Sequence, residues 1–250
     1  MIEIHNLYKK FGSQEVLRGV ELNIERSSTH AIIGRSGCGK SVLLKHIIGL
    51  LQPDRGDIFI GGVNIVGIGE KEKKDIRLKI SMVFQESALF DFLNVEENVG
   101  FVLQRYFPWD RKEIKERVRE SLEMVGLYHI EKKYPKELSG GMKKRVAIAR
   151  AIAFRPRVIL YDEPTAGIDP IGADVINSLI VRLHDQLAIT SVVVSHDLEN
   201  VRKVADTISM MLGGRIIYSG RKDDLSLCHD ERVKQFVSGS RQGPISAQEV

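Results

Sequence analysis

Two separate segments of this chain carry residue types suited to the chemistry of nucleotide phosphates. The first is an unbroken glycine-rich run: Gly34, Arg35, Ser36, Gly37, Cys38, Gly39, Lys40 and Ser41. Its glycines let successive backbone N–H groups turn toward phosphate oxygens, and a helix starting at its end adds a partial positive charge. We expect Lys40 to contact the β- and γ-phosphates and Ser41 to ligate Mg²⁺. The second segment is an apolar run that ends in Asp162 and Glu163. Together the segments predict binding of ATP or GTP with magnesium, followed by hydrolysis.

The two acidic residues suit distinct parts of such a reaction. Asp162 should end a buried strand, where an unpaired charge is costly, and a metal-bound water would offset that cost. We expect Asp162 to act as the metal-linked acid. Glu163 is then placed to polarise the attacking water. The alternative is two surface acids at a strand end, followed by a turn at Pro164.

Three further side chains could contribute, although each also has an ordinary structural interpretation. Gln85 follows an apolar strand, and its amide could ligate Mg²⁺ and position water or only cap a turn. His196 follows another strand and could donate a hydrogen bond to the γ-phosphate or be a satisfied loop residue. Phe11 could stack on a purine or be a core aromatic. Stacking on Phe11 would not by itself select a base. Because the chain has no Asn-Lys-x-Asp segment of the kind that reads guanine, we expect ATP rather than GTP.

Composition is that of a globular protein and narrows the choice of partners. The 250 residues are 43% hydrophobic and 28% charged, with a net charge of +4. That excess is too small to indicate a nucleic acid partner. With only two cysteines, Cys38 and Cys228, a reducing cytosol is expected. No segment has the roughly 18 apolar residues needed to span a bilayer, so action at a membrane would require a partner.

Apolar periodicity predicts strands that alternate with helices. One helical stripe consists of Ile114, Val118, Leu122 and Val125. Strands are expected near residues 2–7, 16–24, 29–33, 57–60, 80–84, 157–161, 190–194, 208–212 and 215–218, and helices within 40–51, 94–154, 171–187 and 231–237. The pattern predicts an α/β fold with a mostly parallel sheet. Ligands of such folds lie beyond the carboxyl ends of the strands, where both phosphate segments would meet.

Taken together, the motifs resemble those of the nucleotide-binding subunit of ABC transporters. They occur in that family's order: Phe11, the loop 34–41, Gln85, the signature Leu138-Ser139-Gly140-Gly141, Asp162-Glu163, Asp169 and His196. The resemblance implies a P-loop NTPase (RecA-like) fold with an N-terminal antiparallel β subdomain and a helical signature subdomain. It implies a nucleotide-binding core of residues 1–84 and 157–237, a helical subdomain of 85–156 and a flexible tail of 238–250.

The same resemblance implies a head-to-tail dimer with two ATP molecules between the copies. Ser139, Gly140 and Gly141 would open a helix whose N–H groups meet a γ-phosphate held by the partner. Asp169 would lie in the interface loop that links the two sites. The stretch 85–100 would receive a helix of an integral membrane permease subunit, which places the chain peripherally on the cytoplasmic face of the inner membrane.

Two departures from the common family pattern resemble a lipid-transporting subfamily. Met142 stands where glutamine is usual, and Thr165-Ala166-Gly167-Ile168 precedes Asp169. Both resemble ATPases that serve MCE-domain lipid systems, such as bacterial Mla. This implies phospholipid transport with an MCE-domain protein and a small soluble regulatory subunit. The alternatives are an importer of a small polar solute and an ATPase acting on ribosomes or DNA. The latter usually has two such domains or a long coiled-coil insertion.

Overall fold

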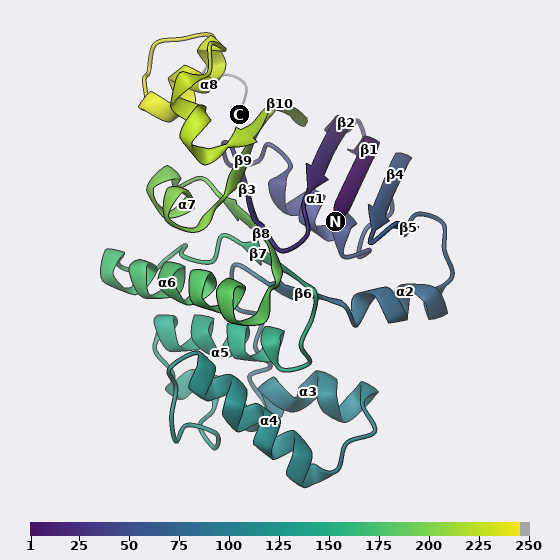
Figure 1. The fold of residues 1–250 in the computed structure, drawn as a ribbon, viewed down its shortest axis with the longest axis vertical. Helices are drawn as coiled ribbons and strands as arrows, with labels where there is room; N and C mark the ends of the chain where they lie inside the picture. Colours follow the sequence, from purple (N-terminus) through teal and green to yellow (C-terminus); the bar gives the residue numbers. More distant parts are fainter. Residues whose placement is uncertain (246–250) are drawn as a thin grey trace.

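The structure, a computed structural model that describes residues 1–245, is built around two β-sheets (Figure 1). The larger has six strands in the order β10-β9-β3-β8-β7-β6. Neighbours from β9 to β6 run parallel, and β10 is antiparallel to β9. The strands are Thr29–Ile33 (β3), Ile80–Val83 (β6), Val158–Asp162 (β7), Thr190–Ser195 (β8), Thr207–Leu212 (β9) and Arg215–Arg221 (β10). Every residue of β3, β6, β7 and β8 is buried, as expected of parallel strands covered on both faces. The predicted α/β fold with a mostly parallel sheet is confirmed.

The smaller sheet is antiparallel and formed mainly by the N-terminal part of the chain. Its order is β2-β1-β4-β5, with strands Ile2–Phe11 (β1), Gln14–Ile24 (β2), Arg55–Ile60 (β4) and Val63–Asn64 (β5). Helix α1 (Lys40–Ile47) packs between the two sheets (Figure 1). Leu44 of α1 shares one apolar core with Leu7 of β1 and Leu160 of β7. The helix that follows the glycine-rich loop is therefore anchored on both sides.

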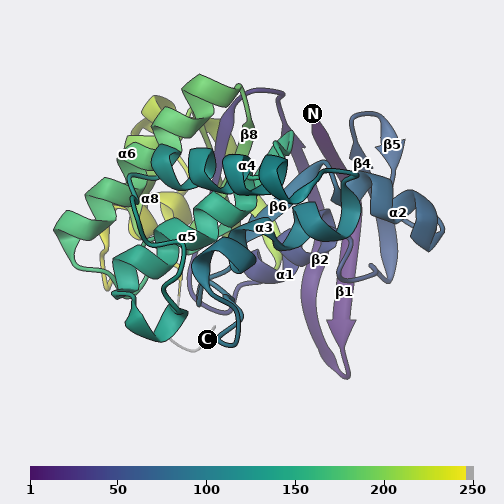
Figure 2. The ribbon, with the colours of Figure 1, turned by 90° about the horizontal axis from the view of Figure 1, so that it is seen from below.

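A group of helices forms a second core below the main sheet. Its members are α3 (Val95–Tyr106), α4 (Arg111–Met124), α5 (Gly140–Ile152) and α6 (Pro170–Leu187). Seen from below, α3, α4 and α5 lie in front of the sheet (Figure 2). The predicted apolar stripe is buried in this core: Ile114, Val118 and Leu122 on α4, and Val125 directly after it. The core also includes Val83 of β6 and Tyr161 of β7, so the helical group is attached to the site-bearing strands.

The remaining helices are short. They are α2 (Glu70–Arg77), α7 (Leu198–Val204), α8 (Glu231–Ser238) and the 3₁₀ segments Pro135–Glu137 and Lys222–Leu227. No residue of α2 is fully buried, as its many charged side chains would require. None of the helices in residues 1–245 has both the length and the apolar character needed to cross a bilayer.

The end of the described chain folds back onto α8. Ser238 still belongs to α8, and Ile245 is 8% exposed within an apolar cluster that includes Val233. The amide of Ile245 donates to Oε1 of Gln235 (2.7 Å), and Nε2 of Gln235 donates to the carbonyl of Ile245 (3.2 Å). A flexible tail was expected over 238–250. Up to Ile245 the structure instead shows packed contacts, and residues 246–250 lie outside the described part.

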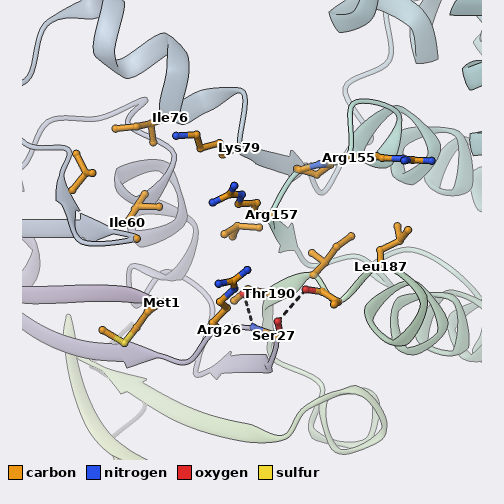
Figure 3. Close-up of a pocket in the computed structure, with 16 residues that line it drawn as sticks. Met1, Arg26, Ser27, Ile60, Ile76, Lys79, Arg155, Arg157, Leu187 and Thr190 are labelled. Atoms are coloured by element: carbon orange, nitrogen blue, oxygen red, sulfur yellow. Dashed lines mark hydrogen bonds between the residues drawn. The ribbon is translucent and has the colours of Figure 1, made fainter. Parts of the chain in front are cut away.

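The main sheet presents two functionally different edges. At the carboxyl ends of the strands, the glycine-rich loop follows β3, Asp162 is the last residue of β7, and His196 follows β8. At the opposite edge, the residues before β6, β7 and β8 line a cavity of about 520 Å³ (Figure 3). The first edge carries the site described next.

Candidate nucleotide site

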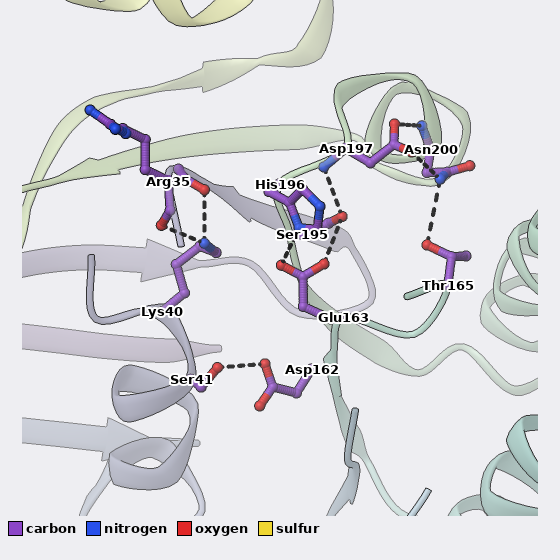
Figure 4. Close-up of polar contacts among 11 residues, drawn as sticks. Arg35, Lys40, Ser41, Asp162, Glu163, Thr165, Ser195, His196, Asp197 and Asn200 are labelled. Carbon is purple, nitrogen blue, oxygen red and sulfur yellow. Dashed lines mark hydrogen bonds and ion pairs between the residues drawn. The ribbon is translucent and has the colours of Figure 1, made fainter. Parts of the chain in front are cut away.

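The glycine-rich loop turns tightly from β3 into α1. Gly34 has a φ of +152°, and a Cβ added there would lie 2.3 Å from the carbonyl oxygen of Met211, so only glycine fits. Lys40 is buried, and its ammonium donates to the carbonyls of Gly34 and Arg35 at 2.8 and 2.9 Å (Figure 4). The loop thus wraps its own lysine, and phosphate oxygens could take the place of those carbonyls as acceptors.

Ser41 and Asp162 meet across this edge of the sheet. The Ser41 hydroxyl, on the first turn of α1, donates to Oδ1 of Asp162 at 2.7 Å (Figure 4). Burial raises the pKa of Asp162, the Ser41 hydrogen bond opposes that shift, and the nearby charge of Glu163 adds to it. A cation between these two oxygens would relieve the cost of the buried charge.

The donor set fits Mg²⁺. Hydroxyl and carboxylate oxygens are the ligands this ion prefers, and it usually keeps only one or two protein ligands beside phosphates and waters. In the described part of the chain, no three His, Cys, Asp or Glu side chains gather closely enough to hold a metal themselves. A cation at Ser41 and Asp162 would therefore complete its shell with phosphate oxygens and water.

Glu163 is held by the end of the neighbouring strand. Its side chain is 11% exposed, and Oε1 lies 2.9 Å from Nδ1 of His196. Ser195 donates its hydroxyl to Oε2 at 3.3 Å. The backbone of Glu163 has a φ of +48°, uncommon for glutamate, and its N–H donates to the carbonyl of Val194 at 3.0 Å. Such strained backbone is found most often at functional sites. The carboxylate is fixed in orientation beside Asp162 (Figure 4).

The predicted acid and histidine are thus brought together. The His196 side chain is 57% exposed, so one ring nitrogen faces Glu163 while the ring remains open to solvent. Sequence reasoning treated Glu163 and His196 separately and did not include Ser195. The available signal was weak, because Ser195 was simply the polar residue that ends a valine-rich strand.

The loop at Gln85 is held by two cations from α5. Lys144 is 6% exposed, and its ammonium donates to the backbone carbonyl of Gln85. Burial lowers the pKa of Lys144, and the charges of Glu86, Glu163 and Asp162 oppose that shift. Sequence reasoning did not assign a role to Lys144, since a lysine in a helix is normally solvated.

Arg150 extends the same clamp along the loop. Its guanidinium donates to the carbonyls of Ser87 (2.8 Å) and Ala88 (2.7 Å), both of which have positive φ. Gln85 itself is exposed. Helix α5 therefore fixes the backbone around Gln85, and the Gln85 residue remains accessible to solvent.

The other predicted binding residues have local roles in this chain. Phe11 is 46% exposed, with the Lys9 ammonium 5.6 Å from its ring centroid. Ser139 caps α5 by accepting from the amide of Met142 (3.3 Å). Asp169 caps α6 by accepting from the amide of Gly172 (2.9 Å). Their roles at a nucleotide, including those of Gly140 and Gly141, stay predictions.

Known proteins resemble this chain over most of its length. The family model described as "ABC transporter" matches residues 17–166. The Arabidopsis thaliana protein TRIGALACTOSYLDIACYLGLYCEROL 3, chloroplastic, is 40% identical over 98% of this chain and 75% of its own length. The intermembrane phospholipid transport system ATP-binding protein MlaF of Haemophilus influenzae is 39% identical over 98% of this chain and 93% of its own.

A solved structure shares the fold. It is a dimeric post-hydrolysis ATP-binding cassette bound to ADP and Pi, with a TM-score of 0.82 and 33% identity, covering 89% of this chain and 99% of that one. The predicted P-loop NTPase fold is confirmed by this similarity.

Proposed function

Because this chain belongs to the ABC transporter family, we propose that it is the ATP-hydrolysing subunit of a transporter that moves phospholipid between membranes. The ATPase assignment rests on the fixed Glu163 carboxylate beside the Ser41–Asp162 pair. The lipid assignment rests on the near-full-length similarity to MlaF.

The residues of the site divide the work of phosphoryl transfer to water. Lys40 holds the terminal phosphates, and Ser41 and Asp162 hold Mg²⁺. When bound, Mg²⁺ supplies positive charge to the phosphate oxygens. Glu163 accepts a hydrogen bond from the attacking water and takes its proton as the water oxygen bonds to the γ-phosphorus. The bond from that phosphorus to the β–γ bridging oxygen breaks at the same time, so ADP leaves with this oxygen and phosphate is released. His196 and Ser195 keep the carboxylate oriented, and the exposed His196 ring can also donate to the γ-phosphate. The Gln85 amide would position the water and could serve as a further ligand of Mg²⁺.

A second copy of the chain completes the site. Gly140 and Gly141 begin α5, and a Cβ added at either would meet nothing within 4 Å. The amide groups of this helix start are therefore approachable, and the helix dipole favours an anion there. We place the γ-phosphate held by one copy against Ser139, Gly140 and Gly141 of the other. Phe11 stacks on the adenine, and Asp169 lies at the same interface. The dimeric cassette with a similar fold supports the pairing of two copies.

A groove beside the Gln85 loop is the proposed seat of the membrane permease subunit. It has a volume of about 630 Å³. Its lining includes aromatic side chains from the loop after β6 and from α3, and the clamp residue Arg150: Phe84, Phe90, Phe101, Tyr106 and Arg150. Phe101 is 41% exposed although it is large and apolar. An apolar face of a partner helix would bury it. With its permease seated there, we propose that the chain lies peripherally on the cytoplasmic face of the inner membrane. We also propose that the complex includes an MCE-domain protein and a small soluble regulatory subunit, as in lipid-transport systems of this type.

An affinity pull-down from gently solubilised native membranes tests this function. The expected result is a multi-span permease recovered with an MCE-domain protein. Recovery of a permease with a solute-binding protein would instead establish an importer of a small polar solute. Recovery of only ribosomal or soluble partners would overturn the transporter assignment.

A surface variant makes that experiment specific. Phe101→Asp should lose the permease, because it puts a charge in the apolar groove. Leu227→Asp is the matched control, since Leu227 is 72% exposed and lies outside the groove. Equal recovery with both variants would contradict the groove assignment.

A further inference from the structure

The cavity at the amino-terminal edge of the main sheet has no part in the ATPase chemistry. Its lining comes from the starts of β6, β7 and β8, the turn before β3, and β4 and β5. We propose that this cavity binds an organophosphate, that is, a phosphate group attached to an apolar organic body.

Basic side chains converge on the cavity. Lys79 and Arg157 immediately precede β6 and β7, and Arg26 lies in the turn before β3. Their charged ends point toward the same space, while the guanidinium of Arg155 turns away from it (Figure 3). None of the sixteen lining residues is Asp or Glu. Within residues 1–245, no salt bridge to a carboxylate involves Lys79, Arg157 or Arg26.

Hydrogen bonds tie together the backbone segments that carry these cations. The amide of Arg157 donates to the carbonyl of Lys79 at 2.8 Å, and the amide of Thr190 donates to the carbonyl of Arg157 at 3.0 Å. The amide of Ser27, next to Arg26, donates to the Thr190 hydroxyl at 2.9 Å (Figure 3). The three exposed cations are thus carried by segments that are tied together at one end of the sheet. An anion between them would be attracted by all three charges.

A phosphate suits these groups better than a monovalent anion. It carries a charge of about −1.5 to −2 near neutral pH and has several acceptor oxygens. Guanidinium groups bind it with paired hydrogen bonds, and an ammonium binds it as a point charge. Arg26, Arg157 and Lys79 provide both kinds of donor.

The apolar part of the lining indicates that the ligand also has an apolar organic body. The lining also includes five large apolar side chains: Ile60, Val63, Ile76, Leu187 and Ile189. Ile60 and Ile76 lie on one side of the cations, and Leu187 lies on the other (Figure 3). The volume of about 520 Å³ is within the range of small-molecule sites, which are roughly 300–1,000 Å³. Inorganic phosphate would leave the apolar walls in water, whereas an organic body would cover them.

This site is separate from the nucleotide site. Strand β7 joins the two, since Val158 at its start lines the cavity and Asp162 at its end faces Ser41. Four residue steps of a parallel strand span about 13 Å. A ligand here should therefore bind whether or not the phosphate loop is filled, and whether or not the chain proves to be a lipid-transport ATPase.

Calorimetry with phenyl phosphate tests the proposal. The probe is titrated into the whole protein with saturating Mg-ADP, which keeps it out of the phosphate loop. We expect saturable binding that Arg157→Gln weakens about tenfold, because one charge-assisted contact is lost. Lys79→Gln combined with Arg157→Gln should abolish it. Arg155→Gln, whose guanidinium turns away, should bind like the unaltered protein.

Two further measurements make the result decisive. All variants should keep the unfolding temperature of the unaltered protein, which rules out loss of fold. Vesicles of phosphatidylcholine with and without phosphatidic acid show whether the bound phosphate belongs to a soluble molecule or to a lipid. Binding of phenyl phosphate without binding to either vesicle indicates a soluble organophosphate. Binding of phenyl phosphate and of the phosphatidic acid vesicles indicates a lipid headgroup. No saturable binding of the phenyl phosphate probe, or equal losses for Arg155→Gln and Arg157→Gln, would overturn the proposal.

Discussion

Replacing Lys144 by methionine should separate catalysis from stability. The ammonium of Lys144 is buried and donates to the backbone carbonyl of Gln85. Hydrogen bonds to charged groups contribute about 1.5–3 kcal/mol. Burial lowers the pKa of Lys144, which shows that desolvation opposes its charge. Methionine is of similar length and removes both the bond and the desolvation cost. We therefore expect the free energy of unfolding to change by less than about 1 kcal/mol.

The ATPase rate should respond more strongly. If about half of the hydrogen-bond energy holds the Gln85 loop in its working position, its loss raises the barrier by about 0.75–1.5 kcal/mol and lowers kcat about 3- to 13-fold. The KM for ATP should change little, because Lys144 does not belong to the phosphate loop.

The assay is steady-state ATP hydrolysis together with thermal unfolding of the same samples. Lys143→Met is the matched control, since it removes the neighbouring charge from the same helix at a partly exposed position. A Lys144→Met protein with normal kcat would refute the clamp. A fall in kcat matched by Lys143→Met would show that the loss comes from charge alone.

Three further substitutions test other parts of the structure. The pKa of Asp162 is raised mainly by burial. The folded state therefore becomes less stable as pH rises from the ordinary aspartate pKa through the raised pKa, because the buried carboxyl must then ionise. Asp162→Asn should therefore raise the unfolding temperature of the nucleotide-free protein at pH 7 and abolish Mg²⁺-dependent hydrolysis. Asp54→Asn should do the opposite to stability, because hydrogen bonds from Lys10 and Lys9 lower the pKa of Asp54; a lower unfolding temperature for both variants would contradict this reasoning. Ile245→Ser should reduce the free energy of unfolding by about 1–3 kcal/mol in a urea titration, whereas an unchanged midpoint would show that the end of the chain is not packed in solution.

The sequence predicted those parts of the fold that depend on local pattern. The buried strands β3, β7 and β8 are short apolar runs next to glycines, acids or polar residues. Helix α4 has its apolar residues on one stripe, and the glycine-rich loop is recognisable because its backbone geometry admits few other residues. These features could be read without knowing what lies across the sheet.

The contacts that were missed are tertiary. Lys144 resembles any surface lysine until α5 is seen to pack against the loop at Gln85. The fold-back of Ile245 onto Gln235 involves a polar, glycine-containing segment, whose composition indicates a free tail. The convergence of Lys79, Arg157 and Arg26 depends on strand order, which brings three distant turns to one edge. None of these residues forms a local motif.

The most direct test of the central claim is ATP turnover by Glu163→Gln. Glutamine keeps the shape and can still accept a hydrogen bond from His196, but it cannot take a proton from water. We expect kcat to fall by at least about a hundredfold, the usual contribution of a positioned general base, and light scattering to show an ATP-dependent dimer. Glu199→Gln, an exposed first-turn residue of α7, should retain normal turnover. Hydrolysis by Glu163→Gln at the normal rate would contradict the assignment of Glu163 as the base.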